Sequence, residues 1–215
     1  MIKSFGALSG HFNEPARGGA ASSLIMVMHG WGADADDLAD LAYPMSLRFP
    51  GAAFFIPNAP DPCSMNPMGR QWFDLADTKD GPSAAASIIE DSVAAAIIEL
   101  DLDMTAVALT GFSQGGMMSL HCGLHMADRP QAVVSFSGAL LGVGDIADID
   151  SRPSVMLIHG TDDQVVPFTM MEAASTILAT HGIEATCVTR PGLGHGIDPD
   201  ALTHAIDFLA LHLPH

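Results

Sequence analysis

The sequence predicts an α/β protein built on a mostly parallel sheet that helices cover on both faces. Short apolar runs, which are typical of buried parallel strands, alternate along the chain with longer segments whose apolar residues recur at helical spacing. Glycine-rich turns follow several of these runs directly. The 215 residues contain no internal repeat and no linker, so we expect a single domain over residues 1–215.

The predicted strands are short runs of apolar and β-branched residues. They are 24–28, 53–56, 105–110, 133–136, 154–158 and 185–190. Because most of the segments between them have helical periodicity, the chain is expected to wind as a series of strand–helix units, which gives parallel pairing.

Two helices are predicted before the third strand. In 38–45, apolar residues recur at helical spacing, and Pro44 should kink this helix or end it early. Residues 83–100 are predicted to form a long helix with Ser83 as its N-cap. Its inner face would carry Ile88, Ile89, Val93, Ile97 and Leu100.

The helices of the second half have clearer boundaries. A helix-like stretch covers 117–127, and a helix over 170–178 should stop near Gly182, which is a C-cap signal. Asp198 and Pro199 predict the start of the last helix, as a cap followed by proline at the first helical position. The stretches predicted to be irregular are 9–22, 58–82 and 139–153.

The most informative motif is at residues 111–116, which read Gly-Phe-Ser-Gln-Gly-Gly between a predicted strand and a predicted helix. This is the G-x-S-x-G pattern, in which a sharp strand-to-helix turn exposes the serine above the sheet. A serine hydroxyl needs a base, and the base needs an acid that orients it. Ser113 is therefore a candidate nucleophile only if the rest of the chain supplies both partners.

An acid and a base follow Ser113 in the order that this turn requires. Asp162 and Asp163 lie just after the strand 154–158, and His195 lies in the loop after the strand 185–190. Sites form at the carboxyl ends of parallel strands, so these side chains are expected to converge there. The residue pattern leaves both aspartates open as the acid.

The turn after the first predicted strand supplies a second element of such a site. His29-Gly30-Trp31-Gly32 is glycine-rich and follows the strand 24–28 directly. Enzymes with this serine turn place one backbone amide here and a second on the residue after the nucleophile, Gln114. The two amides would stabilise an oxyanion, and one such donor is typically worth about 3–4 kcal/mol of the barrier.

These motifs together resemble the carboxylesterase/phospholipase family, which includes the acyl-protein thioesterases and has the α/β-hydrolase fold. The matching segments are Met28–Gly32, Pro57–Pro60, Trp72–Asp74, Gly111–Gly116, His159–Pro167 and Gly194–His195. The resemblance implies Ser113 as nucleophile, Asp163 rather than Asp162 as the acid, and His195 as the base. It also implies that the amides of Trp31 and Gln114 form the oxyanion hole.

The resemblance extends to a substrate pocket, with some departures. The family usually has leucine or another small apolar residue at position 31, and a tryptophan there would narrow the acyl entrance. The candidate pocket residues are Met65, Met68, Trp72, Phe73 and Val166. The methionines and the aromatic pair have an alternative role, which is packing within the loop.

The implied chemistry is hydrolysis of carboxylic esters with short to medium acyl chains, including thioesters and lysophospholipids, through an acyl-enzyme on Ser113. An acyltransferase or perhydrolase would use the same three residues with a nucleophile other than water. A non-catalytic binding module is the third hypothesis. We expect no substantial lid domain, no cofactor and no metal.

Composition restricts the partners. The chain has 25 acidic residues against 8 lysines and arginines. This charge repels phosphate backbones and anionic lipids, so we expect a small-molecule ester or thioester as substrate, no nucleic acid and no stable membrane insertion. A saline habitat is an alternative cause of the acidic surface. Monomer and homodimer both stay open.

The cysteines and histidines outside these motifs predict no further site. Cys63, Cys122 and Cys187 have neither disulfide nor metal spacing, and Cys122 is expected to be a buried apolar filler. With no signal peptide visible, this favours the cytoplasm. His121 and His125 are four residues apart and could ligate a metal, but packing is the favoured role. For His29 and His159, structural support around the site is favoured.

Overall fold

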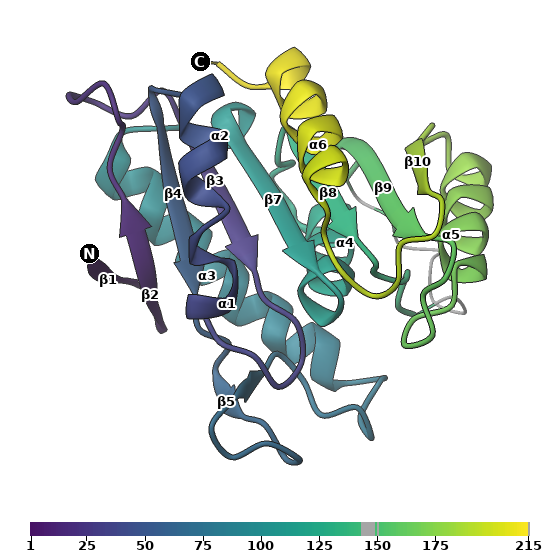
Figure 1. Ribbon diagram of the computed structural model, residues 1–215. Helices are drawn as coiled ribbons and strands as arrows, with labels where there is room; N and C mark the ends of the chain where they lie inside the picture. The colour runs from purple at the N-terminus through teal and green to yellow at the C-terminus, as the bar shows by residue number, and fades with distance from the viewer. Residues whose placement is uncertain (143–148, 150, 215) are drawn as a thin grey trace.

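The structure is a computed structural model and describes residues 1–142, 149 and 151–214. Eight strands in this part of the chain form one sheet in the order β1-β2-β4-β3-β7-β8-β9-β10 (Figure 1). They are β1 Ile2–Phe5, β2 Leu8–Asn13, β3 Ser23–Met28, β4 Ala52–Pro57, β7 Val107–Phe112, β8 Ala132–Phe136, β9 Ser154–Gly160 and β10 Thr186–Arg190. From β4 to β10 all neighbours pair in parallel, as predicted, while β1 and β2 add an antiparallel edge.

Helices cover both faces of the sheet, as predicted (Figure 1). One face carries α1 Asp36–Ala39, α2 Ala42–Arg48 and α6 Pro199–His212. The other face carries α3 Gly81–Leu100, α4 Gln114–His125 and α5 Thr169–Thr180.

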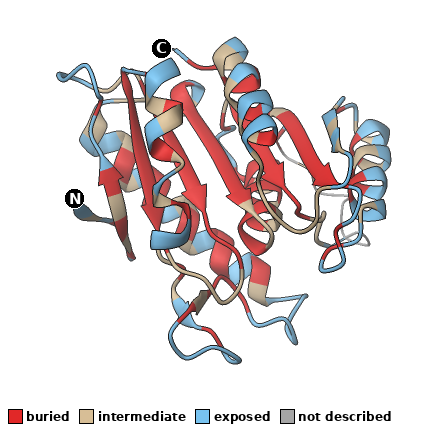
Figure 2. Ribbon diagram, in the orientation of Figure 1, coloured by how far each residue is buried: buried red, intermediate tan, exposed pale blue. Residues whose placement is uncertain are grey.

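The central strands explain why one sheet can support two cores. Every residue of β3 and β4 is buried (Figure 2). Successive side chains of a strand point to opposite faces, so Met26 packs toward α3 and α4 while Ile25 and Val27 pack toward α1, α2 and α6. A continuous apolar run is therefore needed where both faces are covered.

The two strands of the N-terminal hairpin were not predicted. Residues 9–22 were expected to be irregular, but most of the first half of this stretch belongs to β2, which pairs with β1 and β4. Leu8, Gly10 and Phe12 alternate with more exposed residues along β2. This period-2 pattern was present in the sequence, and the intervening glycine and histidine obscured it.

Two helix predictions were wrong in detail. The expected helix over 38–45 is split, because α1 ends at Ala39 and α2 begins at Ala42. Pro44 does not end a helix; it lies in the first turn of α2, where its missing N–H is not needed. Ser83 is not the N-cap of α3, which begins at Gly81.

The other boundaries agree with expectation to within a few residues. A 3₁₀ turn, Met104–Ala106, precedes β7, where the sequence predicted strand from residue 105. The Asp198 side chain caps α6 by accepting from the Ala201 amide at 2.7 Å, as predicted. Gly182, with φ of 74°, follows the end of α5 in the left-handed region that favours glycine.

The irregular stretch 58–82 lies at the carboxyl edge of the sheet (Figure 1). It contains a small antiparallel pair, β5 Asp61–Pro62 and β6 Arg70–Gln71. Part of the third predicted irregular stretch, 139–153, lies outside the described residues. In the part of the chain that is described, no helical insertion interrupts the α/β series at this edge.

Candidate active site

The backbone at Ser113 turns sharply between β7 and α4. Ser113 has φ of 55° and ψ of −118°, a conformation that L-residues rarely adopt. Glycines on both sides make the turn possible, because a Cβ on Gly111 would lie 2.3 Å from the Gly115 carbonyl carbon. A Cβ on Gly115 would lie 2.1 Å from the Met28 carbonyl oxygen. The turn therefore holds the serine at the carboxyl end of the sheet, against the end of β3.

Three side chains from separate loops form a hydrogen-bonded chain. Ser113 Oγ lies 3.0 Å from His195 Nε2, and His195 Nδ1 lies 2.7 Å from Asp163 Oδ2. A carboxylate can only accept, so Nδ1 carries the proton and Nε2 accepts from the serine hydroxyl. The loops after β7, β9 and β10 meet here, as the order of the residues predicted.

The carboxylate of Asp163 is buried, and both of its oxygen atoms accept hydrogen bonds. Its Oδ1 atom accepts from the Val165 and Val166 amides, each at 2.9 Å. Burial acts to raise the pKa of Asp163, but the hydrogen bonds from His195 and from the two amides outweigh it, so the pKa is lowered. The carboxyl group is thus held in its ionised form beside His195.

Asp162 and His159, which are close to Asp163 in the sequence, lie in different environments. Asp162 is exposed and accepts from the Thr161 hydroxyl at 2.8 Å, so it is Asp163 that contacts His195. His159 is buried, and its Nε2 lies 3.3 Å from Asp163 Oδ2 and 2.8 Å from the Val166 carbonyl oxygen. His159 therefore braces the loop that carries Asp163, as the sequence favoured.

The loop that carries His195 is fastened at both ends. Arg190 ends β10 and Asp198 caps α6, and their side chains meet at 2.9 Å and 3.2 Å. A second carboxylate, Asp200, lies 2.6 Å from Arg190. This ion pair closes the loop from 191 to 198 next to the site.

The turn after β3 lies against Ser113. A Cβ on Gly30 would be 3.3 Å from Ser113 Cβ. The backbone amides of Trp31 and Gln114 flank this point, and neither donates a backbone hydrogen bond within the described residues. Neither amide is therefore committed to another backbone group, and their role as an oxyanion hole stays a prediction.

Side chains of the same residues fix the surrounding loops. Gln114 accepts from the Trp72 amide at 2.9 Å and donates to the Phe73 carbonyl at 2.8 Å. Trp31 Nε1 donates to Gln71 Oε1 at 3.1 Å. Gln114 thus ties the stretch 58–82 to the start of α4, a role that the motif did not predict.

His29 is a buried support for the turn. Its Nδ1 donates to the Gly30 carbonyl at 2.7 Å, and its Nε2 accepts from the Ala59 amide at 3.0 Å. Burial lowers the pKa of His29, which is therefore a neutral imidazole that braces the turn, as favoured from the sequence.

The five predicted pocket residues are spread over different environments. Trp72, Phe73 and Val166 are buried, and Trp72 Nε1 donates to the His29 carbonyl at 2.9 Å. Met65 and Met68 are 78% and 87% exposed. Their role in binding an acyl chain stays a prediction.

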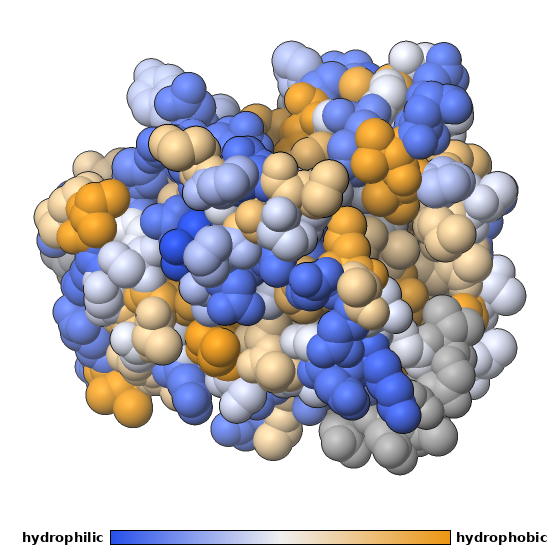
Figure 3. Space-filling model, turned by 90° about the horizontal axis from the view of Figure 1, so that it is seen from below, coloured by the Kyte–Doolittle hydropathy of each residue, from blue (hydrophilic) through white to orange (hydrophobic). Residues whose placement is uncertain are grey.

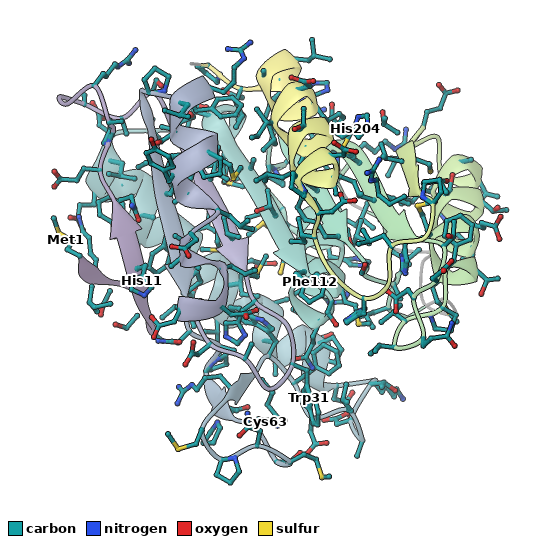
Figure 4. The ribbon with its side chains drawn as sticks, in the orientation of Figure 1. Met1, His11, Trp31, Cys63, Phe112 and His204 are labelled. Carbon is teal, nitrogen blue, oxygen red and sulfur yellow. The ribbon has the colours of Figure 1, made fainter. Side chains whose placement is uncertain are left out.

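Sequence reasoning missed a hollow that lies directly beside His195. It has a volume of about 280 Å³. Its lining comes from Asp37, Leu38, Leu41, Phe112, His195, Gly196 and Ile197. Figure 4 labels Phe112, which lies at the carboxyl end of the sheet with Trp31. Only the spacing of Leu38 and Leu41 was visible in the sequence, and it indicated a helix face.

The remaining candidates form no metal centre. The rings of His121 and His125 lie side by side, 4.8 Å apart, on α4. Among the described residues, no group of three or more histidine, cysteine or acidic side chains could hold a metal ion. Cys122 is buried, as predicted, and burial raises the pKa of its thiol. No helix in the described ranges has the length and apolar character needed to cross a membrane.

Comparison with known proteins identifies the family. Residues 15–213 match the family described as Phospholipase/Carboxylesterase. The chain belongs to the phospholipase/carboxylesterase family. The predicted α/β-hydrolase fold and the resemblance noted above are thereby confirmed.

Relatives within this family cover nearly the whole chain. The chain is 27% identical to Esterase YpfH of Escherichia coli over 209 residues, which is 95% of this chain and 89% of the esterase. It is 28% identical to acyl-protein thioesterase 1 of Gibberella zeae over 210 residues, 86% of each chain. The crystal structure of esterase PE8 superposes with a TM-score of 0.92 at 36% identity, covering 96% of this chain and 99% of that one.

Proposed function

We propose that this member of the family is a serine carboxylesterase whose catalytic residues are Ser113, His195 and Asp163. The hydrogen-bonded chain of these three side chains carries the proposal, because its two distances of 3.0 Å and 2.7 Å suit proton transfer from serine to imidazole. In the first step, Ser113 Oγ attacks the ester carbonyl carbon while His195 Nε2 takes the hydroxyl proton.

Asp163 and the two free amides would stabilise the charges that this step creates. Asp163 holds the Nδ1–H tautomer of His195 and stabilises the imidazolium that forms. The amides of Trp31 and Gln114 donate to the oxyanion. Because the amides belong to a turn and a helix start that are packed against each other, they need little rearrangement when charge develops.

The second half of the reaction restores the enzyme. The imidazolium of His195 gives its proton to the departing oxygen or sulfur, which leaves an acyl-enzyme on Ser113. Water then attacks the acyl carbon while His195 acts as base again, and the acid is released. No step needs a metal or a cofactor.

We further propose that the substrates have short or medium acyl chains and include thioesters. The absence of a helical insertion at the carboxyl edge of the described chain supports an open site, and the similarity to an acyl-protein thioesterase supports thioesters. Faster turnover of long-chain triglycerides than of soluble butyrate esters would overturn the chain-length part.

The three free cysteines, two of them buried, support a reducing compartment, so we propose the cytoplasm as the location. Cell fractionation tests this, and recovery in a secreted or membrane fraction would contradict it.

A paired kinetic assay tests the activity. Wild type and Ser113→Ala are compared on 4-nitrophenyl esters from acetate to palmitate and on one acyl thioester. We expect wild type to cleave the shorter esters and Ser113→Ala to lose at least about 10³-fold in kcat/KM. Equal rates for the two proteins, or no labelling of wild type by a serine-reactive phosphonate, would contradict the proposal.

A further inference from the structure

The hollow beside His195 has a lining that suits one part of an ester substrate. Four of its side chains are apolar, namely Leu38, Leu41, Phe112 and Ile197. The ring of Phe112, which precedes the nucleophile, lies 4.7 Å from the His195 ring. The hollow therefore lies directly against the imidazole of His195, which transfers the proton in the proposed reaction.

The chemistry of the reaction decides which part of the substrate lies here. When the bond between the carbonyl carbon and the leaving oxygen breaks, the proton on His195 Nε2 moves to that oxygen, and a neutral alcohol departs. The leaving oxygen must therefore be within hydrogen-bond distance of His195 at this step. The group attached to it then lies against surfaces next to the imidazole, and the hollow is such a surface.

A carboxylate at the edge of the hollow would also discriminate between leaving groups by their charge. Asp37 is exposed at the edge of the hollow, and its carboxylate makes no hydrogen bond or ion pair within the described ranges. The adjacent carboxylate, Asp36, contacts His11 at 2.5 Å instead. No lysine or arginine lines the hollow. The uncompensated carboxylate of Asp37 would repel an anionic leaving group and attract a cationic one.

Asp37 also interacts electrostatically with His29, which lies in the turn after β3. Burial lowers the pKa of His29, and the hydrogen bond to the Gly30 carbonyl opposes that lowering most, followed by the carboxylates of Asp34 and Asp37. Figure 3 shows the molecule from the carboxyl end of the strands, where hydrophobic side chains are scattered among hydrophilic ones.

We propose that the hollow formed by Leu38, Leu41, Phe112, Ile197 and His195, with Asp37 at its rim, binds the leaving group of the substrate and selects neutral or cationic apolar alcohols over anionic ones. This inference rests on the proposed esterase activity of Ser113. It assigns the alcohol side of the substrate and leaves the acyl side to other parts of the site.

The charge test uses acetate esters that share one acyl group. The probes are benzyl acetate, 4-carboxybenzyl acetate and 4-(trimethylammoniomethyl)benzyl acetate, assayed at low ionic strength. We expect wild type to favour the cationic over the anionic ester, and Asp37→Asn to reduce that ratio of kcat/KM by about tenfold. Asp40→Asn is the matched control, because Asp40 is an exposed carboxylate of the same segment that does not line the hollow.

The shape of the hollow is tested with a variant whose larger side chain fills it. Leu41→Phe should lower kcat/KM for benzyl acetate relative to methyl acetate by about tenfold, since each methylene excluded from an apolar site costs about fourfold. Leu47→Phe on the exposed face of α2 is the control, with Leu47 69% exposed. The acyl-chain profile on 4-nitrophenyl esters should be the same for both variants.

The outcomes separate this inference from the proposed function. Equal changes in the charge ratio for Asp37→Asn and Asp40→Asn would overturn the role of Asp37. A shift of the acyl-chain optimum by Leu41→Phe, with no effect on the alcohol, would assign the hollow to the acyl chain instead. Absence of turnover by wild type on every ester would instead remove the proposed function itself.

Discussion

At the scale of single residues, Asp163 uses its two carboxylate oxygens for different purposes. Oδ1 accepts from two backbone amides of its own loop, and Oδ2 faces His195. The lowered pKa means that ionised Asp163 stabilises the fold at any pH above its ordinary value of 3.8. This contribution is lost only as the pH falls through the lowered value, so it is fully present at neutral pH.

We predict that Asp163→Asn lowers kcat by about 10⁴-fold while leaving the protein folded. An asparagine amide fits the same space, but its NH₂ group favours the wrong tautomer of His195. The measurement is kcat on a short ester, with folding checked by circular dichroism. Asp162→Asn is the matched control and should stay within about threefold of wild type; the opposite order of effects would contradict the assignment.

His121 gives a prediction about stability and pH. Burial and the nearby His125 lower the pKa of His121 to about 4, from an ordinary value of 6.5. Between these values the unfolded chain takes up a proton that the folded protein does not. The free energy of unfolding should therefore fall as the pH drops from 6.5 toward 4.

We predict that the drop in the free energy of unfolding from pH 7 to pH 5 is about 2 kcal/mol smaller in His121→Gln than in wild type. Urea unfolding at both pH values measures it. His204→Gln, an exposed histidine of α6, is the control and should keep the wild-type difference. An unchanged difference in His121→Gln would show that His121 titrates normally.

At the scale of elements, an ion pair links the end of β10 to the start of α6. Arg190 joins the two through Asp198, and the loop between them carries His195. A solvent-accessible, half-buried ion pair of this kind adds little to global stability. Its effect should instead be on the position of the loop.

We predict that Arg190→Gln lowers kcat/KM by about three- to tenfold, because His195 samples positions away from Ser113. The apparent melting temperature should change little. Lys3→Gln removes the cation of a remote ion pair, Lys3–Glu99 at 2.6 Å, and should leave kcat/KM unchanged. Similar losses in both variants would point to a general effect of net charge.

The elements were largely predictable because their signals are local. The buried strands, the serine turn and the Asp198 cap each depend on residues within a few positions of one another. A kink or early end of the helix predicted over 38–45 was expected at Pro44, but the break lies before Ala42. Its position was missed because continuous helical spacing across Leu38 and Leu41 does not indicate where a backbone breaks.

The three catalytic candidates could be proposed from order and loop position, since parallel strands bring their carboxyl ends together. The hollow could not, because Leu41, Phe112 and Ile197 are far apart in the chain and meet only through tertiary packing. The exposed positions of Met65 and Met68 were equally invisible, because loop composition does not specify which side chains face solvent.

At the scale of the whole molecule, charge is the dominant feature. The formal net charge is −17, and the basic residues are too few to neutralise it. Repulsion among like charges destabilises a compact state, and dissolved salt screens it.

We predict that raising NaCl from about 20 mM to about 500 mM raises the melting temperature by about 4 °C, a gain of about 1–2 kcal/mol. We also expect one cooperative transition, as for a single domain over residues 1–215. Scanning calorimetry measures both, and KCl should act like NaCl if screening is the cause. A falling melting temperature with salt, or two separate transitions, would contradict these expectations.

The hairpin of β1 and β2 has a consequence for anyone who shortens the chain. The family match begins at residue 15, after the hairpin. A protein trimmed to that boundary would lose the partner of β4 and leave Ala-Ala-Phe-Phe-Ile-Pro as a bare sheet edge. Such an edge can pair with strands of other molecules. By covering it, the first thirteen residues protect the protein against aggregation.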